Sequence, residues 1–474
     1  MFGSFAVICF GRGVSKSWRS CKNKSMCIFK KRITVLLGAG VPLSLKSKDG
    51  FVPSTKNITK EVLDNSYSVY DLKTRNSSDG TLIKEIYKRS CIEYHPDALN
   101  PSDEQSPAKV HFEILFYVLE MLHTFDRSWQ KATVPKYTNW IAPFLKSRFV
   151  YNTDEFFPAS RHLLDTIIKC VRKYDDVFPS SENDWYRHFW LKNRKRWDLF
   201  NLNYDTTLEQ TLGDYEDGYE DIIDQEGFQR FNIRRLLKNK SRLSTINHMH
   251  GCLLYGNDRY KDINHDAYDY EHQDMYKWSD VDTAYDRWSG SSSSSGTAQD
   301  GSVIVQGPII TGLAKTDKVT CLPYDGYRNN FFKCIKQNRG LLVAGYSFSD
   351  PYINKMFYRM FQAHGNKTRV VLADFWNLAR YYKDNEADMG EPELTDADLS
   401  PRIIEHYFEL GNGNDEMLMF IKRVSHHDVD VWHHFNQLSL SGPMVSDNGC
   451  LMLFVGGFKD AIENHGDDIL RFLK

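Results

Sequence analysis

Ile33-Thr34-Val35-Leu36-Leu37-Gly38-Ala39-Gly40 is the stretch that best indicates the fold. Its first five residues are mostly apolar and partly β-branched, which is typical of a buried parallel strand. A glycine turn directly after such a strand places backbone N–H groups at a helix N-terminus, where a pyrophosphate can bind. The third glycine of the G-x-G-x-x-G fingerprint would fall on Leu43 and is absent. Alone, the loop therefore fits a structural turn as well as a dinucleotide site.

Three later runs repeat the strand pattern, with helical residues between them: Asp198–Leu202, Gly340–Gly345 and Arg369–Asp374. Strands that alternate with helices predict a parallel α/β sheet. Between about 60 and 190 the sequence is mostly helical, and His111–Leu122 is apolar nearly all round, which predicts a buried helix. We therefore expect an α/β fold, a Rossmann-like parallel sheet with a large helical insertion.

The chain divides into three parts by composition. Residues 1–32 hold eight Lys or Arg and no Asp or Glu, so we expect a disordered leader or a start at Met26 rather than a transit peptide. Residues 33–384 would form the catalytic domain, with the helical insertion at about 60–190 and a flexible Ser-rich loop at 289–301. Residues 385–474 would form a small mixed C-terminal region, regulatory or oligomerising, ending in a helix from Asp460 to Lys474.

Bulk composition narrows the class of protein. The 474 residues are 41% hydrophobic and 26% charged, with a net charge of −2, which gives no electrostatic reason to expect binding to nucleic acid or a membrane. The nine cysteines are scattered and no C-x-x-C pair occurs. This argues against a disulfide scaffold or a zinc ribbon and fits a reducing compartment. We expect a cytoplasmic protein without a membrane span.

Two kinds of polar run are expected to be solvated surface. One is the acidic stretch 214–226 with the basic stretch 234–242 behind it. The other is 425–434, which is dense in potential metal ligands. If that segment is helical, Asp430 shares a face with His426 and with His434. Surface polar residues are nevertheless a commoner explanation than a metal site.

Two further segments carry candidate catalytic residues. Asn203 and Asp205 come just after Asp198–Leu202, where ligands collect in parallel sheets, although an Asn-x-Asp pair can also be a turn or a helix cap. His250 lies in Asn247-His248-Met249-His250-Gly251. An imidazole is the natural proton acceptor near neutral pH, and a packed or capping histidine is the alternative.

A serine turn follows the strand that ends at Ala344. Gly345-Tyr346-Ser347-Phe348-Ser349-Asp350 can offer backbone N–H groups and a hydroxyl to phosphate or ribose. Ser349, followed by Asp350, stands where the G-x-S-x-G elbow of a serine hydrolase has its second glycine, which argues against that class.

Together and in this order, the four loops resemble the NAD-binding and catalytic signature of the sirtuin-like superfamily. The resemblance covers roughly residues 33–380 and extends to Pro53-Ser54-Thr55 and Asp350-Pro351-Tyr352-Ile353-Asn354. It implies that Asn203 holds water or ribose, that Asp205 orients the nicotinamide ribose and carboxamide, and that His250 is the base. His250 is preferred to His248 because the family places its base directly before glycine. The cofactor-binding residues that the resemblance implies are Gly38, Ala39, Gly40, Ser54, Thr55, Gly345, Ser347, Asp350, Asn354 and Asp374.

Two departures point to one branch of that superfamily. The protein deacylases carry two Cys-x-x-Cys pairs for zinc and a Pro-Asp-Phe-Arg-type segment, and this chain has neither. The remaining resemblance is to bacterial anti-phage NAD hydrolases. It implies cleavage of NAD to nicotinamide and ADP-ribose without zinc, a homo-oligomer, a partner ATPase or sensor, and no nucleic-acid or membrane partner. An NAD-dependent protein deacylase and a non-catalytic NAD or ADP-ribose module are the alternatives.

Overall fold

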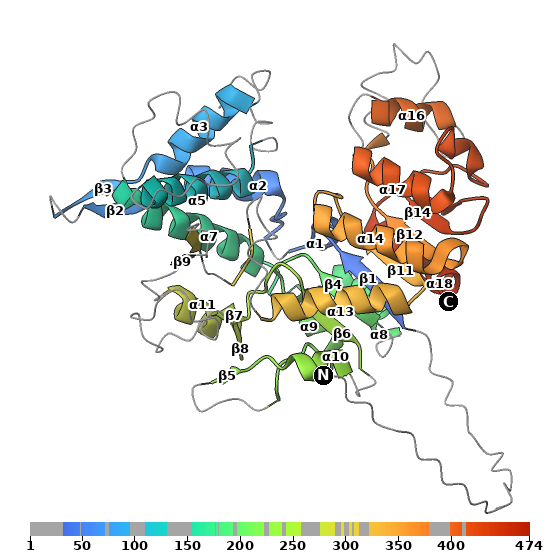
Figure 1. Ribbon diagram of the computed structural model, residues 1–474, viewed down its shortest axis with the longest axis horizontal. Coiled ribbons are helices and arrows are strands. Elements are labelled where there is room, and N and C mark those ends of the chain that lie inside the picture. The colour runs from blue at the N-terminus through green and yellow to red at the C-terminus, as the bar shows by residue number, and fades with distance from the viewer. Residues whose placement is uncertain are drawn as a thin grey trace, which may run out of the picture. The chain divides into compact units, whose positions relative to one another are not determined.

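The computed structural model describes residues 32–47, 49–71, 75–94, 110–129, 153–175, 177–178, 180–192, 197–221, 227–238, 243–256, 275–289, 295–297, 303–305, 308–311, 322–378, 399–409 and 414–474. A seven-stranded, mostly parallel sheet forms the centre, in the order β13-β14-β12-β11-β1-β4-β6 (Figure 1). Its strands are β1 Ile33–Leu37, β4 Trp197–Asn201, β6 Thr245–His248, β11 Gly340–Ala344, β12 Arg369–Ala373, β13 Met444–Val445 and β14 Leu451–Phe454. The predicted Rossmann-like α/β fold is confirmed, and only β13 runs antiparallel.

The register brings the predicted loops to one edge of the sheet. Leu37 pairs with Asn201 on one side and with Ala344 on the other. Asn201 in turn pairs with His248, and Ala344 with Ala373. These residues are the last of their strands, so the loops that follow five parallel strands start from one row.

Helices cover both faces of the sheet because its side chains alternate between them. Leu36 packs with the helices of one face and its neighbours Val35 and Leu37 with those of the other. The first face carries α13 Tyr324–Gln337, α14 Pro351–His364, α16 Pro401–Glu409 and α17 Asp415–Ser425. The second face carries α8 Asp184–Lys192, α9 Thr207–Leu212 and α18 Phe458–Phe472.

A separate hydrophobic cluster lies between β1 and β4 in the chain, where the helical insertion was expected. Its residues come mainly from four helices: α2 Thr55–Asp64, α3 Leu82–Tyr94, α5 Phe112–Trp129 and α7 Phe156–Arg172. A small hairpin, β2 Ser68–Asp71 with β3 Asn76–Asp79, lies between α2 and α3 in the chain. Leu253 and Ile309, which come from the part of the chain beyond His250, belong to the same cluster. This packing connects the helical cluster to the loops at the strand ends.

Shorter elements complete the described chain. They are α1 Gly40–Leu43, β5 Phe228–Gln229, α10 Ile233–Lys238, β7 Tyr255–Gly256, β8 Tyr276–Trp278, α11 Val281–Ser289, β9 Ser295–Thr297, β10 Val303–Val305, and the 3-10 helices η2 Thr153–Glu155, η3 Ser181–Asn183, η5 Gly365–Lys367 and η6 Val431–His434. Among the described helices, none combines the length and apolar character that crossing a bilayer requires.

Three features differ from the sequence-based expectation. The sheet continues past residue 384, because β14 pairs with β12 and α18 packs on both. Within the expected Ser-rich loop, Ser295–Thr297 forms β9 and pairs with β10. The predicted leader lies outside the described residues except for Arg32, whose guanidinium donates to Asp198 and to the carbonyls of Trp197 and Leu243.

The acidic stretch is not all solvated surface, so that expectation is wrong for two residues. Glu216 and Asp217 are only 5% and 7% exposed. Each has a cationic partner that explains its burial: Arg235 lies 2.8 Å from Glu216, and Lys277 lies 2.5 Å from Asp217.

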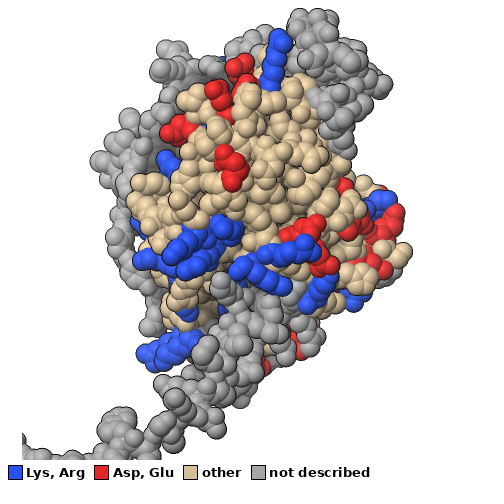
Figure 2. All heavy atoms as spheres, turned by 90° about the vertical axis from the view of Figure 1, so that its right-hand side faces the viewer, with Lys and Arg blue, Asp and Glu red and all other residues tan. Residues whose placement is uncertain are grey.

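Surface charge is distributed unevenly. Figure 2 shows the side of the molecule at the right of Figure 1, where Lys and Arg side chains form a band across the middle of the face. Helices α13 and α14 carry Arg328, Lys336, Lys355 and Arg359, and the ion pairs found within the described ranges include none of them.

Candidate active site at the carboxyl edge of the sheet

The strand order changes direction between β1 and β11. From β1 the chain continues to β4 and β6 on one side, whereas β11, β12 and β14 extend the sheet on the other. Ligands of open α/β sheets bind outside the carboxyl ends of the strands at such a switch point. The loops after β1 and β11 are therefore the starting point for the site.

Glycines let these two loops cross in contact. The N–H of Gly38 donates to the Ala344 carbonyl and that of Gly40 to the Gly345 carbonyl, both at 2.9 Å. A Cβ on Gly38 would lie 2.4 Å from the Gly345 oxygen, and one on Gly40 would lie 2.7 Å from the Gly345 Cα. The two glycines thus have a packing role, and their N–H groups are engaged by backbone rather than directed at a phosphate.

Asn203 is fixed against the glycine loop. Its amide Nδ2 donates to the Gly38 carbonyl at 3.0 Å and to Oδ1 of Asn201 at 2.9 Å. Asn201, the last residue of β4, is 1% exposed and also accepts the Asn203 backbone N–H. These bonds hold Asn203, which is only partly buried, at the switch point.

His250 is paired with Asp350, which is 100 residues away in sequence. His250 Nε2 lies 3.2 Å from Asp350 Oδ2, and the two side chains are 9% and 16% exposed. Asp350 Oδ1 accepts two backbone N–H groups from the first turn of α14, as an N-cap does. Burial opposes ionisation of Asp350, but its hydrogen bonds from His250 and from that first turn hold its pKa below the usual value. Asp350 is thus an ionised carboxylate that orients the imidazole.

The other predicted acid, Asp205, has different surroundings. Its Oδ1 accepts from the backbone N–H of Thr207 and from the Thr207 hydroxyl at the start of α9. The side chain is 3% exposed, and burial raises its pKa above the usual value. Asp205 serves α9 as a buried capping residue, and no hydrogen bond joins it to His250 within the described chain.

His248 is buried at the end of β6, where its Nδ1 lies 3.4 Å from the Asn203 carbonyl. It is 1% exposed, and its Nε2 lies 2.6 Å from Glu209 of α9. Burial opposes protonation of His248, but nearby Cys252 and Glu209 hold its pKa well above the usual value. Glu209, His248 and Cys252 are also close enough together to be considered as metal ligands. The 2.6 Å contact indicates a direct hydrogen bond between Glu209 and His248.

The serine turn is held in place by Asn354, which was expected to bind the cofactor. Asn354 donates to the Phe348 carbonyl at 2.8 Å and accepts from the Tyr346 hydroxyl at 3.0 Å. Phe348, with φ +55°, holds a backbone conformation that is costly for a bulky residue. Ser347 is exposed, and its hydroxyl lies 2.9 Å from that of Ser349. Ser349 is exposed as well, so both hydroxyls are placed where a ligand could reach them.

The remaining predicted positions lie around these loops. Asp374 follows β12 and is bonded through its backbone to Phe454 and Gly457, and burial raises its pKa to about 6. Ser54 caps α2 by accepting the N–H of Asn57, and Thr55 is exposed. The hydrogen bonds of the described chain do not join Ser54 or Thr55 to the loops at the sheet edge.

One segment at the site was missed by the sequence reasoning. Pro308–Thr311 crosses the His250 loop, where the Ile310 N–H donates to the His250 carbonyl at 2.6 Å. Gly251 has φ +108°, and a Cβ there would lie 2.2 Å from the Pro308 oxygen. The Tyr204 hydroxyl donates to the Ile310 carbonyl at 3.1 Å. Glycine is thus required at position 251 because Pro308–Thr311 passes so close to it. The sequence carries only a weak signal for this contact.

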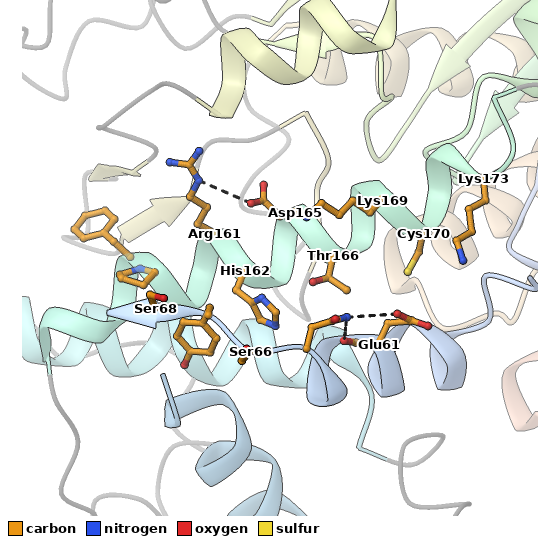
Figure 3. A pocket seen from close by; sticks show the side chains of 14 residues that line it. Glu61, Ser66, Ser68, Arg161, His162, Asp165, Thr166, Lys169, Cys170 and Lys173 are labelled. Carbon is orange, nitrogen blue, oxygen red and sulfur yellow. Dashed lines mark hydrogen bonds and ion pairs between the residues drawn. The ribbon is translucent and has the colours of Figure 1, made fainter. Parts of the chain in front are cut away.

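A cavity of about 610 Å³ lies apart from these loops, between α2, β2 and α7 (Figure 3). Its lining includes the Arg161–Asp165 ion pair and His162, which stacks on Tyr67 at 4.9 Å between ring centroids. It shares no residue with the predicted site.

Comparison with known protein families identifies one domain in the chain. Residues 198–391 match the model of the SIR2-like domain family. The chain carries a SIR2-like domain. The matched range begins in β4 and contains Asn203, His250, the serine turn and Asp374. It does not include the glycine loop, which joins the SIR2-like domain through the hydrogen bonds to Asn203, Ala344 and Gly345. No match was found among curated proteins. SIR2-like domains use NAD, so the domain has an NAD-related function.

Proposed function

We propose that the SIR2-like domain hydrolyses NAD to nicotinamide and ADP-ribose. The observation that carries the proposal is the His250–Asp350 pair in the same row of loops as Asn203. A module that only bound NAD would not need an imidazole held by an ionised carboxylate. Hydrolysis needs such a group to accept a proton from water.

The chemistry requires little else from the chain. Nicotinamide leaves C1′ of the ribose as a neutral molecule because its ring nitrogen is cationic in NAD, so no general acid is needed. Water forms the new C1′–O bond while the C1′–N bond breaks, and the water proton passes to His250. In the tautomer that donates Nε2–H to Asp350, the lone pair is on Nδ1. Asn203, held by Gly38, would position the ribose or the water.

The biological setting follows from the same proposal. An enzyme that depletes NAD must be restrained until it is needed, and the proposed role is that of a cytoplasmic anti-phage effector. A homo-oligomer, or a partner ATPase or sensor, would supply the restraint and the trigger. The helical cluster and the C-terminal helices α16 and α17 are the proposed places for that control.

The direct test is nicotinamide release from NAD by the purified full chain. The parent, His250→Ala, Asn203→Ala and the surface control His433→Ala would be compared, with folding checked by circular dichroism. We expect release by the parent and by the control, and loss of release in the two site variants. Equal release by all four would refute the site. Acetyl-peptide deacylation without net NAD hydrolysis would replace the proposed reaction with protein deacylation.

A further inference from the structure

The histidine-rich segment 425–434 does not form one continuous α-helix. Helix α17 ends at Ser425, and His426 takes a left-handed conformation with φ +61°. The spacing of His426, Asp430 and His434 on one helical face is therefore not realised. Instead, the rings of His427 and His434 stack face to face, with centroids 3.4 Å apart and planes 3° from parallel.

A single carboxylate joins these two rings. Asp447, in the turn between β13 and β14, places Oδ1 3.1 Å from His427 Nε2 and Oδ2 3.1 Å from His434 Nδ1. The three residues form a group whose potential ligand atoms all lie within 4.8 Å of one another. Imidazole nitrogens and carboxylate oxygens are both common ligands of transition metals, so the group offers three ligand atoms at one place.

The backbone around the group is held in place by hydrogen bonds. The N–H of Asp447 donates to the His434 carbonyl at 2.8 Å. Asn448 donates to the carbonyls of Val424 and Ser425, at 3.1 and 2.8 Å, which attaches the turn to the end of α17. Ligands that are already in place lose little conformational entropy when an ion binds.

We propose that His427, His434 and Asp447 form a binding site for a divalent transition-metal ion of the zinc type. Two imidazole nitrogens and one carboxylate oxygen suit Zn²⁺, Ni²⁺ or Cu²⁺, whereas Mg²⁺ and Ca²⁺ prefer oxygen ligands alone. The side chains are 26%, 37% and 47% exposed, so water can reach the site and complete the coordination. To bind one ion, the two rings would rotate out of their parallel stack, so that both nitrogens point to the ion in place of their hydrogen bonds with Asp447.

The site would join three elements that are separate in sequence. They are the end of α17, η6 and the β13–β14 turn. At its other end, α17 begins at the capping residue Asn414, whose side chain also donates to the Ser347 carbonyl at 2.8 Å. An ion that binds only the native state stabilises it by mass action, so binding should raise the melting temperature of the full chain.

The experiment is a zinc titration of the metal-free full chain by calorimetry and by competition with a chromophoric chelator. His427→Ala, His434→Ala and Asp447→Asn test the three ligands. His433→Ala and His426→Ala are matched controls, because both histidines are exposed and lie in the same segment. MgCl₂ replaces zinc in a parallel titration.

We expect one zinc site that is retained in both controls and weakened at least about a hundredfold in each histidine-ligand variant, since even outer-shell changes cost ten- to a hundredfold. Zinc should raise the melting temperature of the parent and controls only, and Mg²⁺ should have no such effect. Absence of a zinc site in the parent, or equal binding in the His427→Ala/His434→Ala double variant, would overturn the proposal. Asp447→Asn keeps the size of the side chain, so a loss confined to zinc binding cannot be ascribed to unfolding.

Discussion

His250 Nε2 and Asp350 Oδ2 lie 3.2 Å apart, which joins the loop after β6 to the first turn of α14. The same carboxylate caps α14 through its other oxygen. Asp350 therefore positions the imidazole while its own place is fixed by a helix. The sequence-based hypothesis had Asp205 orient the nicotinamide ribose and carboxamide, and it gave Asp350 to cofactor binding.

The first prediction separates these two acids. Asp350→Asn should lower NAD turnover about a hundredfold or more, because an amide cannot favour the correct tautomer or stabilise the imidazolium. Asparagine is also a good N-cap, so the free energy of unfolding should change by less than about 1 kcal/mol. Asp205→Asn should reduce turnover less. The measurements are steady-state kinetics and urea unfolding of the parent, Asp350→Asn and Asp205→Asn. A larger loss of turnover in Asp205→Asn than in Asp350→Asn would contradict this assignment.

The glycine crossing leads to a prediction about stability. Gly345 has φ +57°, and a Cβ on it would lie 2.6 Å from the Gly40 Cα. Gly345→Ala should therefore destabilise the fold by about 3 kcal/mol or more, since left-handed strain and a backbone clash act together. Gly50 has φ +72° but no atom within 4 Å of its Cβ position, so Gly50→Ala should cost only about 1 kcal/mol. Equal shifts in the urea midpoint would show that the close approach of the loops has no energetic weight.

Four strands of the sheet were predictable because each has a local signal. β1, β4, β11 and β12 are apolar runs followed by glycine or small polar residues, and that pattern needs no distant partner. β6, β13 and β14 were not predicted. β6 is a short run of mostly polar residues, and the two and four residues of β13 and β14 pair with each other and with β12.

The partners of the site residues were not predictable in the same way. Whether Asp205 or Asp350 reaches His250 depends on contacts across 100 residues, which spacing does not encode. The crossing of Pro308–Thr311 behind Gly251 is also a long-range contact. A sequence motif can thus indicate which residues share a site more readily than which of them touch.

The buried Glu209–His248 pair carries a third prediction. Glu209→Met or His248→Leu alone should cost about 3–5 kcal/mol, because each leaves a buried partner without its counterpart. The double variant should cost clearly less than the sum of the two, as a double-mutant cycle by urea unfolding would measure. The exposed Lys192–Asp467 pair is the control, and Lys192→Met should cost no more than about 1 kcal/mol. Simple additivity at Glu209 and His248 would mean that they do not interact energetically.

Asp374 allows a prediction about pH. Burial raises its pKa from 3.8 to about 6 in the folded chain, so between these values the folded state binds more protons than the unfolded state. The contribution of Asp374 to stability therefore falls as the pH rises from about 4 to 6, by up to about 3 kcal/mol. Asp374→Asn removes this loss and should become progressively more stable relative to the parent over that interval. The measurement is the difference in urea midpoint between the two proteins from pH 4 to pH 7.

Asp280 provides the control of opposite sign for Asp374. A hydrogen bond from the Thr283 backbone N–H holds the pKa of Asp280 below its usual value. Its contribution to stability is therefore present above pH 3.8 and is lost as the pH falls through the folded pKa. The difference in urea midpoint between Asp280→Asn and the parent should therefore be constant from pH 5 to pH 7. The corresponding difference for Asp374→Asn should still change between pH 5 and about pH 6. A pH-independent difference for Asp374→Asn would mean that its carboxylate is ionised throughout, despite its burial beside the ends of β12 and β14.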